Sequence, residues 1–154
     1  MLKVYICEDS SKQLERITKA VKNTILIEEL DMELEVATKD PFEILSHVEN
    51  SSETGIYFLD VELDAAIDGI ELASKIRNHD ALGFIAFVTT HPELSYLTFK
   101  YKVEALDYIV KDGDEKLETS IRECLLNINQ RIVKTKKEAK KFFYAKCGQK
   151  VMHI

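Results

Sequence analysis

The stretch YFLDVEL, residues 57–63, is an apolar run that ends in a group of acids. Its apolar part has the length and aromatic content of a strand buried on both faces of a sheet. Asp60 follows directly, where low polarity disfavours a charged carboxylate. Because carboxylates are seldom buried without a partner, an acid in this position is either a helix or turn cap or a functional group.

Short apolar runs of the same kind recur along the chain, too short for helices and rich in β-branched and aromatic residues. They are LKVYIC (2–7), LEVAT (34–38), GIYFL (55–59), FIAFVTT (84–90) and LDYIV (106–110). Segments with apolar residues at helical spacing follow each of them. Because parallel strands need crossover connections, normally helical, we expect an α/β fold with a doubly wound, five-stranded parallel sheet. This domain is expected to cover residues 1–136.

The end of the chain differs in character from this domain. Residues 137–154 begin with a charged run and finish with an apolar, β-prone sequence, VMHI, after a turn-like step at Gly148. The segment is too short to bury a core alone. We interpret it as a linker that either packs on the domain or leads into the opening strand of a second, truncated domain.

The composition indicates a soluble globular protein. With 154 residues, 45% of them hydrophobic, the chain suits one domain of ordinary size. No apolar run approaches the ~20 residues that span a bilayer, and the amino terminus has no signal-peptide pattern, so a cytoplasmic location without membrane contact is expected. The three cysteines and four histidines form neither a disulfide framework nor a metal-ligand motif.

The net charge of −6 is unevenly distributed. Residues 131–150 hold eight basic residues and one acid, which leaves 13 basic and 26 acidic residues elsewhere, a net charge of −13. Such a body repels nucleic acid, whereas the basic end could approach it. The simpler interpretation of the basic end is a solvated helix end and a linker.

Chemically active side chains stand at the ends of four predicted strands. Glu8 and Asp9 follow the first strand, Asp60 follows the third, Thr89 ends the fourth and Lys111 follows the fifth. Because ligands of such sheets bind at the carboxyl ends of the strands, we expect these side chains to lie together. The sequence has no Gly-rich phosphate loop, which excludes the dinucleotide-binding and NTPase versions of the fold.

Three clustered carboxylates repel one another unless a cation lies among them. An all-oxygen set with open positions suits Mg²⁺, so Glu8, Asp9 and Asp60 are the expected ligands. The backbone carbonyl of Glu62 is a further candidate ligand.

One of the carboxylates can also act as a nucleophile and form an acyl phosphate. Asp60 is the expected nucleophile, because it ends the central strand and backbone on both sides holds it fixed. Lys111 would pair with a phosphoryl oxygen, and Thr89 would donate a hydrogen bond to the phosphoryl group.

In order and spacing, these residues resemble the receiver domain of two-component response regulators, over residues 1–135. The resemblance implies a flavodoxin-like (βα)5 receiver fold with Mg²⁺ as cofactor. It implies that Asp60 accepts a phosphoryl group from a sensor histidine kinase, in a self-catalysed step of a phosphorelay rather than in enzymatic turnover. Thr89 and Tyr108 are then the switch residues, and the ring of Tyr108 would turn inward as Thr89 moves.

The sequences ICED (6–9), YFLDVEL (57–63) and FFYAKCGQKV (142–151) are similar to the Agr and competence-type regulators, whose receiver precedes a LytTR DNA-binding domain. This similarity implies regulation of transcription, in peptide quorum sensing. It also implies a homodimer through the fourth and fifth helices after phosphorylation, and promoter DNA bound only through the missing C-terminal domain. Residues 137–154 would be the linker and the start of that domain.

Two positions depart from the common receiver pattern. Asp112 stands where many receivers have a proline after a cis peptide bond, and a cis bond without proline costs ~3 kcal/mol, which argues against that geometry here. Gly69 comes one residue later after Asp60 than in the commonest pattern, which makes the Glu62 carbonyl a weaker metal-ligand candidate than the carboxylates.

Two other functions are compatible with the same residues. An aspartate-dependent Mg²⁺ phosphohydrolase uses similar acyl-phosphate chemistry, but that class usually has an Asp where this chain has Glu62, two residues after the nucleophile. The other alternative is an interaction module that works without phosphorylation, in which the acids only cap helices.

Overall fold

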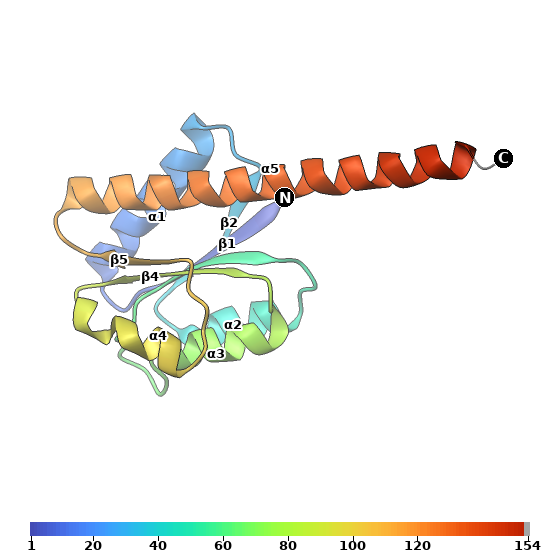
Figure 1. The fold of residues 1–154 in the computed structure, drawn as a ribbon. Helices are drawn as coiled ribbons and strands as arrows, with labels where there is room; N and C mark the ends of the chain where they lie inside the picture. The colour runs from blue at the N-terminus through green and yellow to red at the C-terminus, as the bar shows by residue number, and fades with distance from the viewer. Residues whose placement is uncertain (153–154) are drawn as a thin grey trace.

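The computed structural model describes residues 1–152, with side chains for residues 1–113 and 115–147. Five parallel strands form one sheet in the order β2-β1-β3-β4-β5. Helices cover both faces of this sheet (Figure 1). The predicted doubly wound α/β fold is therefore confirmed.

Strands and helices alternate along the chain. The strands are β1 (Leu2–Cys7), β2 (Met32–Thr38), β3 (Gly55–Leu59), β4 (Phe84–Thr89) and β5 (Asp107–Val110). The helices are α1 (Ser11–Ile27), α2 (Pro41–Glu49), α3 (Gly69–His79), the 3-10 turn η1 (Pro92–Ser95), α4 (Tyr96–Lys100) and α5 (Asp114–Met152). Each strand lies within two residues of its predicted range at either end.

Polar residues begin three of the helices. The side chains of Ser10, Asp40 and Asp68 accept hydrogen bonds from backbone N–H groups in the first turns of α1, α2 and α3. Pro41 follows Asp40 at the first helical position, where its missing N–H costs nothing. Asp is among the residue types that favour this position before a helix, which explains why α2 and α3 begin directly after Asp40 and Asp68.

The sheet separates two hydrophobic layers because successive side chains of a strand point to opposite faces. On one face, Val4 and Ile6 of β1 pack with α1 and α5. On the other face, Tyr5 and Cys7 pack with α2 and α3. Figure 1 shows the same division, with α1 and α5 on one side of the strands and α2, α3 and α4 on the other.

The last part of the chain is helical, which corrects one expectation. The turn-like step expected at Gly148 and the first two residues of the β-prone end, 151–152, lie within α5, which continues without a break to Met152; residues 153–154 lie outside the described residues. A lone strand here would have no neighbouring edge to pair with, whereas a helix bonds its own backbone groups. Residue 136, the expected end of the receiver domain, lies inside α5.

None of the helices in the described residues has the length and apolar character needed to cross a membrane.

Candidate functional site

The carboxyl ends of β1, β3 and β5 bring four of the predicted side chains into contact. Asp60 follows β3, and its backbone N–H donates to the carbonyl of Cys7 at the end of β1, 3.0 Å away. Only 9% of the Asp60 side chain is exposed. Asp60 is thus fixed at the middle of the sheet, beside the end of the neighbouring strand.

Three carboxylates meet at this point. Oxygen atoms of Glu8, Asp9 and Asp60 all lie within 4.8 Å of one another. Glu8 is the most buried of them, with 1% of its surface exposed, and one of its oxygens accepts from the backbone N–H of Ser10. The sequence predicted this cluster, because β1 and β3 are neighbours whose carboxyl ends share one edge of the sheet.

Lys111 joins two of the three acids. Its ammonium nitrogen lies 2.6 Å from Glu8 Oε2 and 3.2 Å from Asp60 Oδ2, and its side chain is 7% exposed. The backbone N–H of Lys111 donates to the carbonyl of Thr89, which fixes the turn after β5 against the end of β4. One ammonium therefore partly compensates three converging carboxylates, and the site stays net negative.

Glu8 shows the electrostatic cost of this arrangement. Burial raises its pKa to about 7, and the nearby Asp60 carboxylate adds to the rise, while the hydrogen bond from Lys111 opposes it. A second cation at the cluster would favour the charged form of Glu8.

The donor set fits Mg²⁺. Three carboxylate oxygens in reach of a common point form an all-oxygen, anionic site, and Mg²⁺ prefers a few carboxylates together with water or phosphate oxygens. Asp9 is half-buried, so the site is accessible from solvent. The carbonyl of Glu62 stays a predicted ligand; the Glu62 N–H donates to Asp60 Oδ1, 3.3 Å away, so this loop does turn toward the cluster.

Thr89 ends β4, the neighbour of β3, and is fully buried. Its hydroxyl oxygen accepts a hydrogen bond from the backbone N–H of His91, 3.2 Å away. A hydroxyl can accept and donate at once, so the O–H of Thr89 can still donate to an incoming anion.

Tyr108 lies on β5 and is bound to the loop that follows β4. Its hydroxyl donates to the backbone carbonyl of His91 at 2.7 Å, and its ring packs against Phe87 with centroids 5.9 Å apart. Burial raises the pKa of Tyr108 to about 12, so the phenol keeps its proton at neutral pH. Thr89 and Tyr108 thus hold the same loop residue through its N–H and its carbonyl.

His91 is the functional candidate that the sequence did not single out. Its imidazole lies 3.0 Å from a carboxylate oxygen of Glu62 and 3.0 Å from one of Glu93. The hydrogen bond with Glu93 raises the pKa of His91, and the charge of Glu62 adds to this. The signal in the sequence was its place two residues after Thr89, but the pairing depends on how two loops fold.

The backbone around Asp60 explains Gly69. A Cβ atom at residue 69 would lie 1.8 Å from the carbonyl oxygen of Asp60, so only glycine allows α3 to begin this close to β3. The N–H of Gly69 also donates to the carbonyl of Val61. The peptide bond between Lys111 and Asp112 is trans, like all peptide bonds in the described part of the chain, as the missing proline led us to expect.

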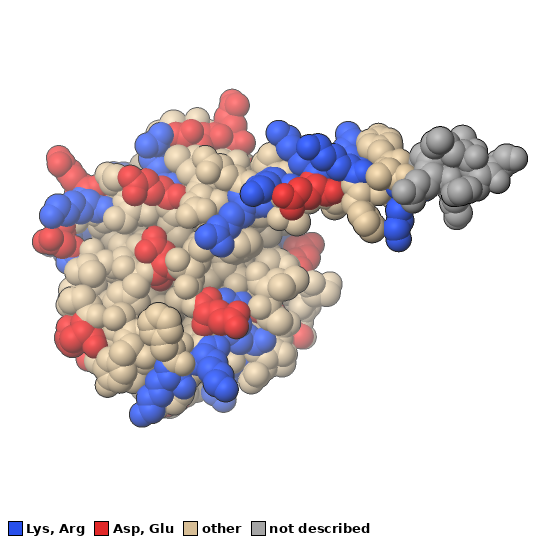
Figure 2. Space-filling view, in the orientation of Figure 1, with Lys and Arg blue, Asp and Glu red and all other residues tan. Residues whose placement is uncertain are grey.

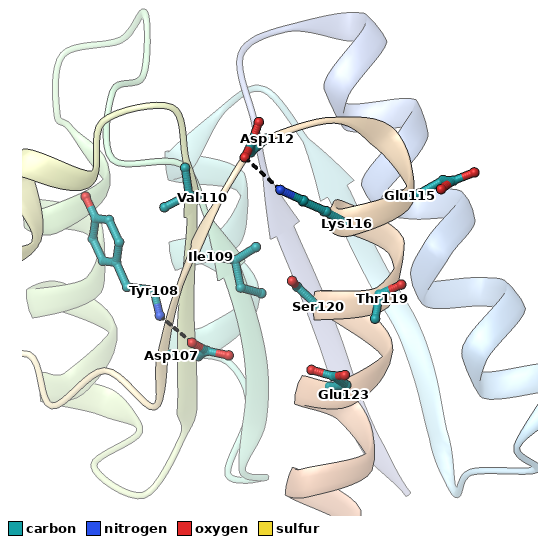
Figure 3. Close-up of a pocket in the computed structure, with 10 residues that line it drawn as sticks. All are labelled: Asp107, Tyr108, Ile109, Val110, Asp112, Glu115, Lys116, Thr119, Ser120 and Glu123. Carbon is teal, nitrogen blue, oxygen red and sulfur yellow. Dashed lines mark hydrogen bonds and ion pairs between the residues drawn. The ribbon is translucent and has the colours of Figure 1, made fainter.

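A separate groove of about 620 Å³ lies between β5 and the first turns of α5 (Figure 3). Acidic side chains line much of it, and Lys116 pairs with Asp112 at one end. Tyr108 and Ile109 point to opposite sides of β5 in this view, so Tyr108 faces away from α5. β5 therefore lies between this groove and the loop after β4 that the Tyr108 hydroxyl contacts.

Comparison with known proteins agrees with this geometry. Residues 4–122 match the family model of the response regulator receiver domain. The chain is 46% identical over 138 residues to accessory gene regulator protein A of Staphylococcus epidermidis, covering 90% of this chain and 58% of that protein. It is 48% identical over 131 residues to the protein of the same name from Staphylococcus aureus, covering 85% and 55%. The chain thus spans little more than half the length of these relatives.

Solved structures support the fold. The response regulatory domain of protein mrkE from Klebsiella pneumoniae superposes with a TM-score of 0.67 at 23% identity, over 84% of this chain and 99% of that one. The response regulator TrrA from Thermotoga maritima, in complex with Mg(2+)-BeF, superposes with a TM-score of 0.60 at 18% identity, over 80% and 99%.

Proposed function

Because this chain belongs to the response regulator receiver domain family, we propose that Asp60 is its phosphoacceptor. The observation that carries the proposal is the cluster of Glu8, Asp9 and Asp60 with the Lys111 ammonium bridging two of them. A structural cap needs one carboxylate at a helix start, whereas three converging acids and a buried lysine are suited to a small, highly charged group.

The proposed step transfers a phosphoryl group from a phosphohistidine of a sensor histidine kinase. A carboxylate oxygen of Asp60 attacks phosphorus, so that a P–O bond forms while the P–N bond breaks. The imidazole leaves with the electron pair of that bond and takes up a proton. The product is an acyl phosphate on Asp60.

The other residues of the site bind and orient the group. Glu8, Asp9 and Asp60, with the Glu62 carbonyl, would hold Mg²⁺, which when bound neutralises charge on the phosphoryl oxygens. Lys111 exchanges its contact with Asp60 for one with a phosphoryl oxygen. Thr89 donates its hydroxyl proton to another.

The switch follows from the contacts of His91. Moving Thr89 toward the phosphoryl group pulls on the His91 N–H, and the His91 carbonyl in turn holds the Tyr108 hydroxyl. A change at Asp60 thereby reaches β5 and α4, and with them the surface that α4, β5 and α5 form together. We propose that this face forms a homodimer when Asp60 is phosphorylated.

The remaining proposals concern the whole protein. The high identity to two proteins named accessory gene regulator supports a cytoplasmic transcription regulator that acts in peptide quorum sensing. Residues 1–136 would be its receiver domain. Residues 137–154 would lead into a LytTR domain that binds promoter DNA.

Intact mass spectrometry tests the site. After incubation with Mg²⁺ and acetyl phosphate, we expect one adduct of about 80 daltons, the mass of a phosphoryl group, that hydroxylamine removes. Asp60→Asn should show none, while Asp64→Asn, a nearby exposed acid, should be modified like the wild type. An adduct on Asp60→Asn would contradict the assignment. Many turnovers per chain would instead indicate a phosphohydrolase, and a folded wild type without adduct an interaction module.

A further inference from the structure

The end of α5 forms a separate charged feature, which we call the basic extension, residues 131–147. It holds seven basic residues and one acid, and every residue from Val133 to Cys147 is exposed. Figure 1 shows α5 running past the sheet into solvent, and Figure 2 shows lysine and arginine side chains gathered along it. Nothing in the proposed phosphorylation mechanism uses these charges.

Arg131, at the start of the basic extension, still lies on the domain, whereas the later part of α5 runs past the sheet (Figure 1). With a rise of 1.5 Å per residue, residues 133–147 cover about 21 Å of helix. At physiological ionic strength the screening length is ~8 Å, so most of these charges act independently of the net negative domain. A polyanion repelled by the body can still meet the extension.

The arrangement of the side chains favours a polyanion over other partners. At 100° per residue, basic side chains stand on all sides of the helix, so there is no wide apolar face to enter a lipid surface. Two copies of the helix would repel each other. The ammonium nitrogens of Lys140 and Lys146 lie over the rings of Tyr144 and Phe142, 5.8 Å and 4.9 Å from the centroids, so the exposed aromatic side chains of this segment are accompanied by positive charge.

We propose that the basic extension binds the phosphate backbone of double-stranded DNA, without sequence preference. The partner is chosen by charge complementarity, because seven basic residues against one acid on an exposed helix match a dense row of phosphates. The contact does not depend on phosphorylation of Asp60. It would position the protein along DNA rather than specify a base sequence.

The test measures binding of the 154-residue chain to a fluorescent duplex of arbitrary sequence, by anisotropy over a range of salt concentrations. The variant K136Q/K137Q/K140Q/K141Q removes four charges from the extension. The matched control K19Q/K22Q/K39Q/K75Q removes four exposed lysines from the body. Glutamine has nearly the helix propensity of lysine, and circular dichroism checks that the helix is kept.

We expect weak binding by the wild type, with a slope of log affinity against log salt of about −3.6 if four phosphates are contacted. The extension variant should bind at least tenfold more weakly, and the body control should bind with nearly the wild-type affinity. Asp60→Asn should bind like the wild type, so this proposal and the phosphoacceptor assignment fail separately. Equal losses in both lysine variants, no binding by the wild type, or a preference for anionic lipid vesicles over DNA would each overturn the proposal.

Discussion

A carboxyl group buried among other acids keeps its proton to a higher pH than one in water. The pKa of Glu8 is raised to about 7 by burial, from 4.5. Between these values the folded state binds more protons than the unfolded state, so stability falls as pH rises. We predict that the metal-free protein loses on the order of 3 kcal/mol of unfolding free energy from this group between about pH 4.5 and 7. Urea titrations in chelator at several pH values measure this.

Two controls separate this effect from general acid titration. In Glu8→Gln, which has no proton to exchange, the loss over the same pH window should largely disappear. Excess Mg²⁺ should reduce the loss in the wild type, because a bound cation favours the charged carboxylate. An unchanged pH dependence in Glu8→Gln would show that Glu8 is not the group responsible.

At the scale of single residues, the sequence predicted those positions that the sheet itself determines. Glu8, Asp60 and Lys111 could be placed together because each directly follows a strand, and parallel strands end at one edge. The contacts of His91 could not be predicted, because they depend on how the loops that carry Glu62 and Glu93 fold.

At the scale of elements, the close approach of α3 to β3 rests on one glycine. Gly69→Ala would place a Cβ atom 1.8 Å from the carbonyl oxygen of Asp60, and backbone cannot yield as a flexible side chain does. We predict a loss of about 3 kcal/mol or more, as for severe overpacking. Gly113→Ala is the control, with φ 81 and open space around it, where only backbone strain of about 1–2 kcal/mol applies. Thermal or urea unfolding that ranks Gly113→Ala as the more damaging change would contradict this account.

Arg77 fastens the end of α3 to the loop before β5. Its guanidinium donates to the carbonyls of Val103 and Glu104 in that loop, and to Ala81 in the turn after α3. A planar group with five N–H donors can serve both segments at once, whereas a lysine ammonium cannot.

We therefore predict that Arg77→Lys lowers the free energy of unfolding by about 2–4 kcal/mol, since several charge-assisted hydrogen bonds are lost. Arg122→Lys is the control. Arg122 makes an exposed pair with Glu28, and such pairs contribute at most ~1 kcal/mol. Urea unfolding of both variants measures the difference, and similar losses would mean that Arg77 is a simple surface arginine.

The elements themselves were largely predictable, with one exception. Buried strands of a parallel sheet are near-continuous apolar runs, and helix caps such as Asp40 and Asp68 have clear side-chain signals. The exception is the described part of the β-prone end: residues 151–152 are helical, because local propensity toward strand has little effect without a neighbouring strand to pair with. They extend the helix that precedes them.

At the scale of the whole molecule, the domain presents an exposed aromatic surface on α4 beside the face formed by β5 and α5. Phe99 is 84% exposed, and Tyr96 and Tyr101 are also exposed. Exposed large apolar side chains that gather on one element are typical of an interaction surface. The Tyr108 hydroxyl donates to the carbonyl of His91, which directly precedes η1 and α4, so the proposed phosphorylation of Asp60 would reach this surface through that loop.

We predict that the phosphorylated chain dimerises through this surface and that Phe99→Ser weakens the dimer. Burying a phenylalanine side chain contributes about 1.5–3 kcal/mol, so the dissociation constant should rise roughly 10- to 100-fold. Leu82→Ser is the control, because Leu82 is 80% exposed but lies in the loop before β4, at the other end of the strands. Sedimentation velocity with and without acetyl phosphate compares the variants. If both variants weaken the dimer equally, α4 is not the interface. If the phosphorylated wild type stays monomeric, phosphorylation of Asp60 acts on a surface other than this one.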